Sequence, residues 1–203
     1  MGKDIETIYI VDDDPAVREA LSSLLRANGK HVRAFTGGAE FLSFERDDTP
    51  ACLILDLEMP GMNGLEVQQC VAATLPIIFI SGCGDIDSTV KAMKAGASDF
   101  LTKPVEEARL LSAVEEALCE HRIARCDALY HAVLRERFGS LTPREHEVLA
   151  LLVAGRLNKQ IAAELGIAEY TVQIHRGNIM RKMKADSFAT LVKLAETLKP
   201  NLP

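Results

Sequence analysis

The sequence lacks an apolar run long enough to cross a membrane, and its first residues lack the apolar core of a secretion signal. We therefore expect no membrane segment and a cytoplasmic location. The five cysteines are scattered, with no CxxC pair and no metal-ligand spacing. This pattern argues against a disulfide framework or a zinc site and favours free or buried thiols in a reducing compartment.

Charge is distributed unevenly along the 203 residues, a length that suits two domains. Residues 1–125 carry 12 Lys and Arg against 21 Asp and Glu, a net charge of −9. Residues 126–203 carry 11 against 8, a net charge of +3. A basic second part can mark contact with nucleic acid, although differences of this size also arise on ordinary solvated surfaces.

One stretch, from Cys52 to Gly64, organises the first part of the chain. It begins as an apolar run typical of a strand buried on both faces, reaches Asp56, and continues into a loop containing Pro60 and Gly61. Asp56 is therefore expected at the carboxyl end of a buried strand, the edge where open parallel sheets bind ligands. Alone, an Asp in this place is more often a cap or turn residue.

Four other apolar segments alternate with helical patterns around this one. The alternation predicts an α/β fold, a doubly wound five-stranded parallel sheet of flavodoxin-like strand order 2-1-3-4-5. The five expected strands are Thr7–Val11, His31–Phe35, Cys52–Asp56, Pro76–Ile80 and Asp99–Leu101.

Polar side chains follow four of these strands at the same sheet edge. Asp12 and Asp13 end the first strand, Asp56 the third, Ser81 the fourth and Lys103 the fifth. Three adjacent carboxylates repel one another unless a cation joins them, and an oxygen-only site suits Mg²⁺. Lys103 supplies positive charge suited to a phosphoryl group, so Asp56 is a candidate nucleophile that would form an aspartyl-phosphate.

Residues 5–120 resemble the receiver domain of two-component response regulators. The resemblance rests on the acidic pair, on Asp56 with Met59-Pro60-Gly61 and Gly64, on Ser81, and on Lys103-Pro104. It implies that Asp56 is the phosphoacceptor and that Mg²⁺ is held by Asp13 directly, by Asp12 through water, and by Asp56 and the main-chain carbonyl of Glu58.

The same resemblance implies a switch around this pocket. Ser81 would hydrogen-bond the phosphoryl oxygens, Lys103 would pair with them, and Phe100 would be the aromatic side chain that rotates. The Lys103–Pro104 bond is expected to be cis. Cys83, on a neighbouring loop, is read as an unreactive thiol in preference to a redox sensor. The phosphorylated form is expected to dimerise through a surface that would include Val90, Lys94 and Asp99.

A helical pattern without Gly or Pro runs from Val105 to Gly139. Its two apolar stripes differ in phase, with a polar interruption near Glu120. We expect either one long helix or two helices with a bend there. Residues 121–138 would form a semi-rigid linker, with pairing as a coiled coil only weakly indicated. The expected domains are thus 1–120, this linker, and 139–203.

The second domain is expected to be all-α. Thr142, Pro143 and Glu145 have the spacing of a capping box that begins a helix. Asn158 opens a second helix that stops at Gly166, and a short turn leads into a polar, basic helix of residues 170–184. This is the helix-turn-helix pattern, followed by a fourth helix after Ser187.

This part resembles the LuxR-type DNA-binding domain of the NarL/FixJ regulators, FixJ-like branch. The residues that carry it are Leu141-Thr142-Pro143-Arg144-Glu145, Asn158-Lys159-Gln160-Ile161-Ala162, Thr171-Val172, His175-Arg176, Ile179-Met180 and Lys182-Met183. Gln and Arg can read base edges, whereas Lys and Arg near the helix end are suited to phosphates. The expected DNA contacts are Lys159, Thr171, Gln173, His175, Arg176, Arg181 and Lys182.

Two departures from this pattern concern the third helix. Ala168 stands where a capping Ser or Thr is usual, at a cost of about 1 kcal/mol unless Glu169 compensates. Gly177 stands where some relatives carry a basic side chain, so their target sequences are not transferred.

The sequence therefore predicts a phosphorylation-switched transcription regulator and not an enzyme. Its expected partners are a sensor histidine kinase, promoter DNA, RNA polymerase and, once phosphorylated, a second copy of itself. Activation is favoured over repression. Two alternatives are a Mg²⁺-dependent phosphohydrolase, which lacks its usual DxDxT-like pattern here, and a constitutive DNA-binding protein whose receiver-like domain only pairs with partners.

Overall fold

The structure, a computed structural model, describes residues 6–82 and 86–198. The chain divides into two compact units, Met1–Arg125 and Cys126–Pro203, each with its own core. Cys83 lies outside the described residues, so the expectation that it is an unreactive thiol stays a prediction. The four described cysteines, Cys52, Cys70, Cys119 and Cys126, form no disulfides.

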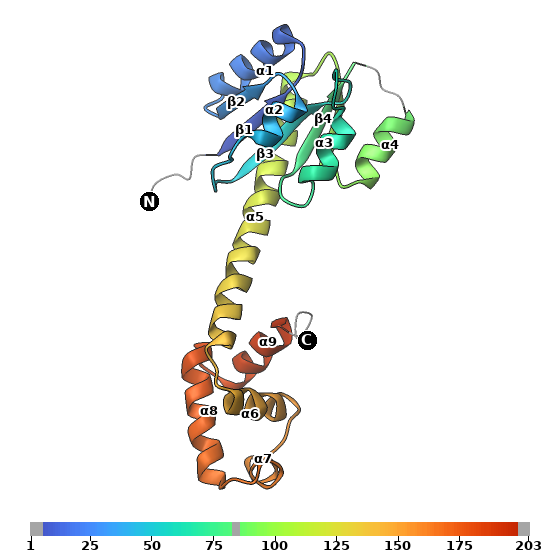
Figure 1. The fold of residues 1–203 in the computed structure, drawn as a ribbon. Helices are drawn as coiled ribbons and strands as arrows, with labels where there is room; N and C mark the ends of the chain where they lie inside the picture. The colour runs from blue at the N-terminus through green and yellow to red at the C-terminus, as the bar shows by residue number, and fades with distance from the viewer. Residues whose placement is uncertain (1–5, 83–85, 199–203) are drawn as a thin grey trace. The chain divides into compact units, whose positions relative to one another are not determined.

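The first unit is built on the predicted parallel sheet, and its order, β2-β1-β3-β4-β5, is the one expected (Figure 1). Every residue of the three central strands is buried, which explains their uninterrupted apolar sequences. The strands are β1 (Thr7–Val11), β2 (His31–Phe35), β3 (Ala51–Asp56), β4 (Ile77–Ser81) and β5 (Asp99–Thr102).

Helices cover both faces of this sheet. Helices α1 (Pro15–Ala27) and α5 (Glu107–Gly139) pack on one face, where Leu25, Ile54 and Val114 belong to one apolar cluster. Helices α2 (Gly38–Ser43), α3 (Gly64–Val71) and α4 (Ile86–Lys94) pack on the other. The doubly wound architecture leaves the carboxyl edge of the strands open for polar side chains.

Helix α5 is assigned as one helix of 33 residues, so the alternative of two helices is not needed. Its first turns belong to the first unit, where Leu110 and Leu118 are fully buried. Near its end, Leu134 is buried in the core of the second unit. The predicted domain boundaries at residues 120 and 139 both fall inside this helix.

The second unit consists of the end of α5 and four further helices: α6 (Pro143–Val153), α7 (Asn158–Leu165), α8 (Glu169–Met183) and α9 (Phe188–Leu198). The predicted capping box is present: Glu145 N–H donates to Thr142 Oγ1 at 3.3 Å and Thr142 N–H donates to Glu145 Oε2 at 2.8 Å. Gly166 takes the left-handed conformation that ends α7.

Two helix starts in this unit lack a capping side chain. Ala168 makes no cap hydrogen bond at α8, as its methyl side chain dictates. Asn158 was expected to open α7 from outside, but it is the first helical residue and Leu157 occupies the cap position. The Gln160 side chain accepts the Leu157 N–H at 2.9 Å, the returning half of a capping box. Because Asn158 is not the cap residue, its side chain is available to Arg176.

Among the described helices, none is both long and apolar enough to span a bilayer.

Candidate functional site

Asp12, Asp13 and Asp56 lie together at the carboxyl edge of the sheet, as the strand order predicts. One carboxylate oxygen from each lies within 4.8 Å of the others. Asp12 and Asp56 are 2% and 6% exposed, whereas Asp13 faces solvent. The pocket thus combines two buried carboxylates with the solvent-exposed carboxylate of Asp13, which is directly accessible to an ion.

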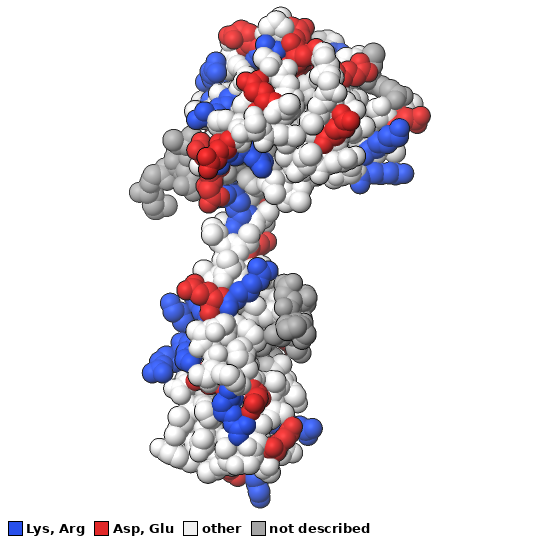
Figure 2. All heavy atoms as spheres, viewed as in Figure 1, with Lys and Arg blue, Asp and Glu red and all other residues white. Residues whose placement is uncertain are grey.

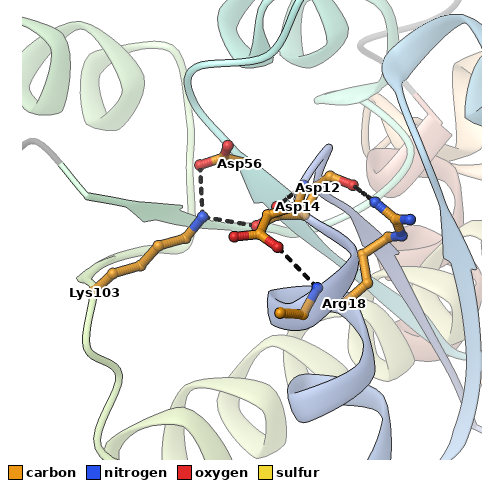
Figure 3. Close-up of polar contacts among 6 residues, drawn as sticks. Asp12, Asp14, Arg18, Asp56 and Lys103 are labelled. Carbon is orange, nitrogen blue, oxygen red and sulfur yellow. Dashed lines mark hydrogen bonds and ion pairs between the residues drawn. The ribbon is translucent and has the colours of Figure 1, made fainter.

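Lys103 supplies the opposing charge from the loop that follows β5. Its ammonium donates to Asp12 Oδ2 at 2.8 Å and to Asp56 Oδ1 at 3.3 Å (Figure 3). The Lys103–Pro104 peptide bond is cis, as expected. Burial alone would lower the pKa of Lys103, but the bonds to Asp12 and Asp56 outweigh it, so the pKa lies above its ordinary value.

The pKa of Asp56 is also displaced upward. Burial is the largest cause and the charge of Asp12 the next, while Lys103 acts in the opposite direction. A second cation near Asp56 would oppose both causes and favour the charged carboxylate. The local charge balance therefore favours binding of a cation.

Two residues that sequence reasoning did not assign to the site hold Asp12 in place. Arg18 of α1 donates to the Asp12 carbonyl oxygen at 2.7 Å, and the Asp14 N–H donates to Asp12 Oδ1 at 2.9 Å (Figure 3). Asp14 itself caps α1, as its position predicts, by accepting the Ala16 N–H at 2.8 Å. No sequence signal pointed to Arg18, because its contact depends on how α1 packs.

Gly64 allows the loop after Asp56 to pack closely. A Cβ atom here would lie 2.5 Å from the Asp56 carbonyl oxygen and 2.9 Å from the Phe79 ring. Asn63 caps the helix that Gly64 begins, in a reciprocal box with Glu66. The Asn-x-x-Glu spacing was a signal for this cap that the sequence reading missed.

The other predicted members of the site lie around this pocket. Ser81 is buried at the end of β4, and its carbonyl accepts the Lys103 N–H at 2.8 Å. Glu58 is exposed in the loop after β3. Phe100 on β5 is partly buried and stacks on Phe79 with ring centroids 6.2 Å apart.

Of the three residues of the expected dimer surface, one forms an ion pair within the chain and two are exposed. Val90 is 43% exposed and Lys94 is exposed on α4. Asp99 instead forms an ion pair with Arg109 Nη2 of α5 at 2.7 Å. A contact between Asp99 and a second copy of the chain would have to compete with this ion pair.

The residues present fit a hard divalent cation. All three side-chain donors are carboxylate oxygens, the ligand type that Mg²⁺ prefers, and the exposed Asp13 gives access from solvent. Mg²⁺ would be held by Asp12, Asp13 and Asp56, with the Glu58 carbonyl as the further expected ligand. It would neutralise the carboxylates and polarise a phosphoryl oxygen.

In the second unit, α8 presents the polar face expected of a recognition helix. Its core side, formed by Val172, Ile179 and Met183, is fully buried. Basic and acidic side chains are interspersed on the face shown in Figure 2, with a group of basic side chains on the left side of this unit. The predicted DNA contacts that are exposed are Lys159, Gln173 and Arg181.

The remaining predicted DNA contacts are tied more closely to their own unit. Arg176 Nη1 donates to Asn158 Oδ1 at 2.7 Å, and its guanidinium lies 5.4 Å from the Phe188 ring centroid. Lys182 Nζ donates to the buried Glu145 Oε2 at 2.6 Å. Thr171 and His175 are partly exposed, and His175 Nδ1 is buried without a hydrogen bond.

Two apolar side chains on α8 were missed as candidates for a binding face. Tyr170 is 72% exposed and Ile174 is 46% exposed, on the same helix as Gln173. Apolar groups in this setting can contact the methyl group of thymine.

A receiver-like α/β unit with an acidic pocket facing a lysine, joined to a helix-turn-helix unit, defines the class of response regulators. Comparison with known proteins agrees. Residues 8–115 match the family described as the response regulator receiver domain, and residues 139–195 match the bacterial regulatory proteins of the luxR family.

Individual relatives extend this match over nearly the whole chain. The response regulator protein TodT of Pseudomonas putida is 48% identical over 100% of this chain and 90% of its own length. The transcriptional regulatory protein FixJ of Rhizobium meliloti is 41% identical over 93% of this chain and 94% of its own length. The solved structure of the response regulator StyR matches with a TM-score of 0.87 and 48% identity, covering 95% of this chain and 98% of StyR.

The chain belongs to the NarL/FixJ family of two-component response regulators, and it is a transcription regulator with a receiver domain and a LuxR-type DNA-binding domain. Its relatives are regulators and not enzymes, which removes the phosphohydrolase alternative.

Proposed function

We propose that a sensor histidine kinase phosphorylates Asp56 in the presence of Mg²⁺, and that this modification switches the chain to a dimeric, promoter-binding form. The observation that carries the proposal is the pairing of one lysine with two buried carboxylates, at 2.8 Å to Asp12 and 3.3 Å to Asp56. This arrangement supplies a nucleophile and a cation at one sheet edge that is open to a donor.

In the reaction, an oxygen of Asp56 bonds to phosphorus while the bond from phosphorus to the imidazole nitrogen of the kinase breaks. The electron pair of the broken bond stays on the imidazole. Lys103 then pairs with the phosphoryl oxygens, and the Ser81 hydroxyl hydrogen-bonds one of them. Asp56 must be a charged carboxylate to attack, and its pKa is raised by burial and by the charge of Asp12, so a bound cation would favour the reactive form.

The surface that would change on phosphorylation and form the dimer contact is the face of α4 and β5. Ile86 and Met93 are 76% and 43% exposed and share the face of Val90, at the i, i+4, i+7 spacing of one stripe. An exposed apolar stripe supports a contact between two copies. Movement of Ser81 and Phe100 toward the phosphoryl group would change the packing beneath this face.

Dimerisation would bring two copies of α8 to half-sites about 34 Å apart, one turn of DNA. Gln173 would read base edges, and Lys159 and Arg181 would contact phosphates. The bound dimer would recruit RNA polymerase and activate transcription. Because the partners are a promoter and a kinase's phosphorylated histidine, we place the protein in the cytoplasm.

The proposal is tested by incubating the full chain with acetyl phosphate and Mg²⁺ and measuring its intact mass. Wild type should gain one phosphoryl group, Asp56→Asn should gain none, and Asp127→Asn, which removes an exposed carboxylate elsewhere, should behave as wild type. Absence of the modification in wild type would instead favour the constitutive DNA-binding alternative.

A further inference from the structure

A cavity of about 350 Å³ opens at the amino-terminal edge of the receiver sheet, opposite the edge that carries Asp56. Its wall comes from β1, the segment between α2 and β3, the segment between α3 and β4, and α5. The volume lies at the lower end of the range for small-molecule sites. Nothing in the phosphorylation chemistry uses this cavity.

Two buried hydroxyl groups in the cavity wall lack hydrogen-bond partners. Tyr9 is 1% exposed, and its Oη forms no hydrogen bond of ordinary distance and angle. The main chain of Asp47 lies near this oxygen. Thr49 Oγ1 is also buried without a partner. Buried polar atoms are almost always satisfied in native proteins, so two orphan hydroxyls in one cavity indicate a missing partner.

The charges around the cavity leave one cation uncompensated. Asp48 pairs with Arg125, and Asp47 pairs with Arg33 at 3.9 Å. Arg46 has no carboxylate within 4.0 Å among the residues that the structure describes, and its only polar side-chain contact there is with Thr74 Oγ1 at 3.5 Å. The missing partner is therefore expected to be an anion.

One wall of the cavity is already fixed by hydrogen bonds. His121 Nδ1 accepts the Ala51 N–H at 2.8 Å, and the ring also bonds the main chain of Thr74. Burial, and then the charge of Arg125, lower the pKa of His121, and the hydrogen bond accepted at Nδ1 requires a ring without a proton on that nitrogen. The His121 ring is thus held in place at the side of the cavity, and Phe44 and Leu75 add apolar surface to its lining.

We propose that this cavity binds a small organic carboxylate with an apolar body. The carboxylate would accept hydrogen bonds from the Tyr9 and Thr49 hydroxyls and pair with Arg46, while its body packs against Phe44 and Leu75. The site is separate from the phosphorylation pocket and does not depend on the proposed switch.

The test is a titration of the isotope-labelled full chain followed by amide NMR, with benzoate and hexanoate as probes. Benzamide and benzylamine serve as neutral and cationic comparisons. We expect saturable shifts at the amides of Thr49, Ala51 and Thr74, with the carboxylates binding at least tenfold more tightly than benzamide or benzylamine.

Two variants locate the binding. Arg46→Gln should weaken it at least tenfold and Tyr9→Phe several-fold. Both should fold, because Tyr9→Phe removes no hydrogen bond and Arg46→Gln removes only an exposed 3.5 Å contact with Thr74 Oγ1 and a cation–π contact with Phe41. Arg26→Gln, which removes a cation from α1, should bind as wild type. Absence of saturable shifts, equal binding by Arg46→Gln and wild type, or shifts centred on Asp12 and Asp56 would overturn the proposal.

Discussion

The ammonium of Lys103 lies closer to Asp12, at 2.8 Å, than to the proposed phosphoacceptor Asp56, at 3.3 Å. Asp12 is in turn held by the Asp14 N–H and by Arg18. Lys103 is therefore anchored mainly by a carboxylate that does not react, which leaves its ammonium in place while Asp56 changes from a carboxylate to a phosphate.

This anchoring predicts the effect of Lys103→Ala. The substitution leaves two buried carboxylates without their cation, which costs stability because an unpaired buried charge is poorly solvated. Since Lys103 is 23% exposed, we expect a loss of about 1–2 kcal/mol, below the range for fully buried pairs. Urea denaturation without Mg²⁺ measures it, and unchanged stability would show that solvent already screens the carboxylates.

Asp56→Asn should raise stability at neutral pH when no divalent cation is present. The pKa of Asp56 is raised in the folded state, so its charged form disfavours folding at pH values above that pKa. The gain should shrink as the pH falls through the folded pKa, because wild type then carries a neutral carboxyl group. Denaturation series between pH 4 and pH 8 test the sign, and a variant less stable than wild type at pH 7 would contradict it.

Mg²⁺ should stabilise wild type with the logarithm of its concentration once that concentration exceeds the dissociation constant, by roughly 2.7 kcal/mol at a hundredfold excess. Asp13→Asn should abolish this gain and change metal-free stability by less than about 0.5 kcal/mol, since Asp13 is exposed. Thermal unfolding with and without Mg²⁺ separates the two effects. An equal Mg²⁺ gain in both proteins would remove Asp13 from the site.

Substitutions at Gln173 and Arg176, two of the expected DNA contacts, should have different effects on stability. Gln173 is exposed, so Gln173→Ala should weaken specific promoter binding by about 1–3 kcal/mol and leave stability within about 0.5 kcal/mol. Arg176→Ala should lower both, because its guanidinium joins Asn158 and Phe188. Gel-shift titration and thermal unfolding of both variants distinguish the roles. Loss of stability in Gln173→Ala alone would reverse the assignment.

The elements of the fold were predictable because their signals are local. The strand order followed from alternating apolar and helical segments, and the meeting of Asp12, Asp13 and Asp56 followed from that order. Helix ends were placed within one or two residues: Asn158, expected just before α7, is its first residue, and Leu157 occupies the cap position.

Contacts between distant side chains could not be predicted in the same way. Lys182 of α8 pairs with Glu145 of α6, 37 residues away along the chain, and nothing in either local sequence encodes this contact. The cavity beside Tyr9 also depends on where loops and α5 meet. In both cases the determining information is the packing of helices, which the periodicity of a sequence does not specify.

The most direct test of the switch is sedimentation velocity of wild type and Asp56→Asn, each with Mg²⁺ and with or without acetyl phosphate. Wild type should change from monomer to dimer only when acetyl phosphate is present, and Asp56→Asn should sediment as a monomer in every condition. Dimerisation of Asp56→Asn to the same extent as phosphorylated wild type, or a wild type that never dimerises, would contradict the account.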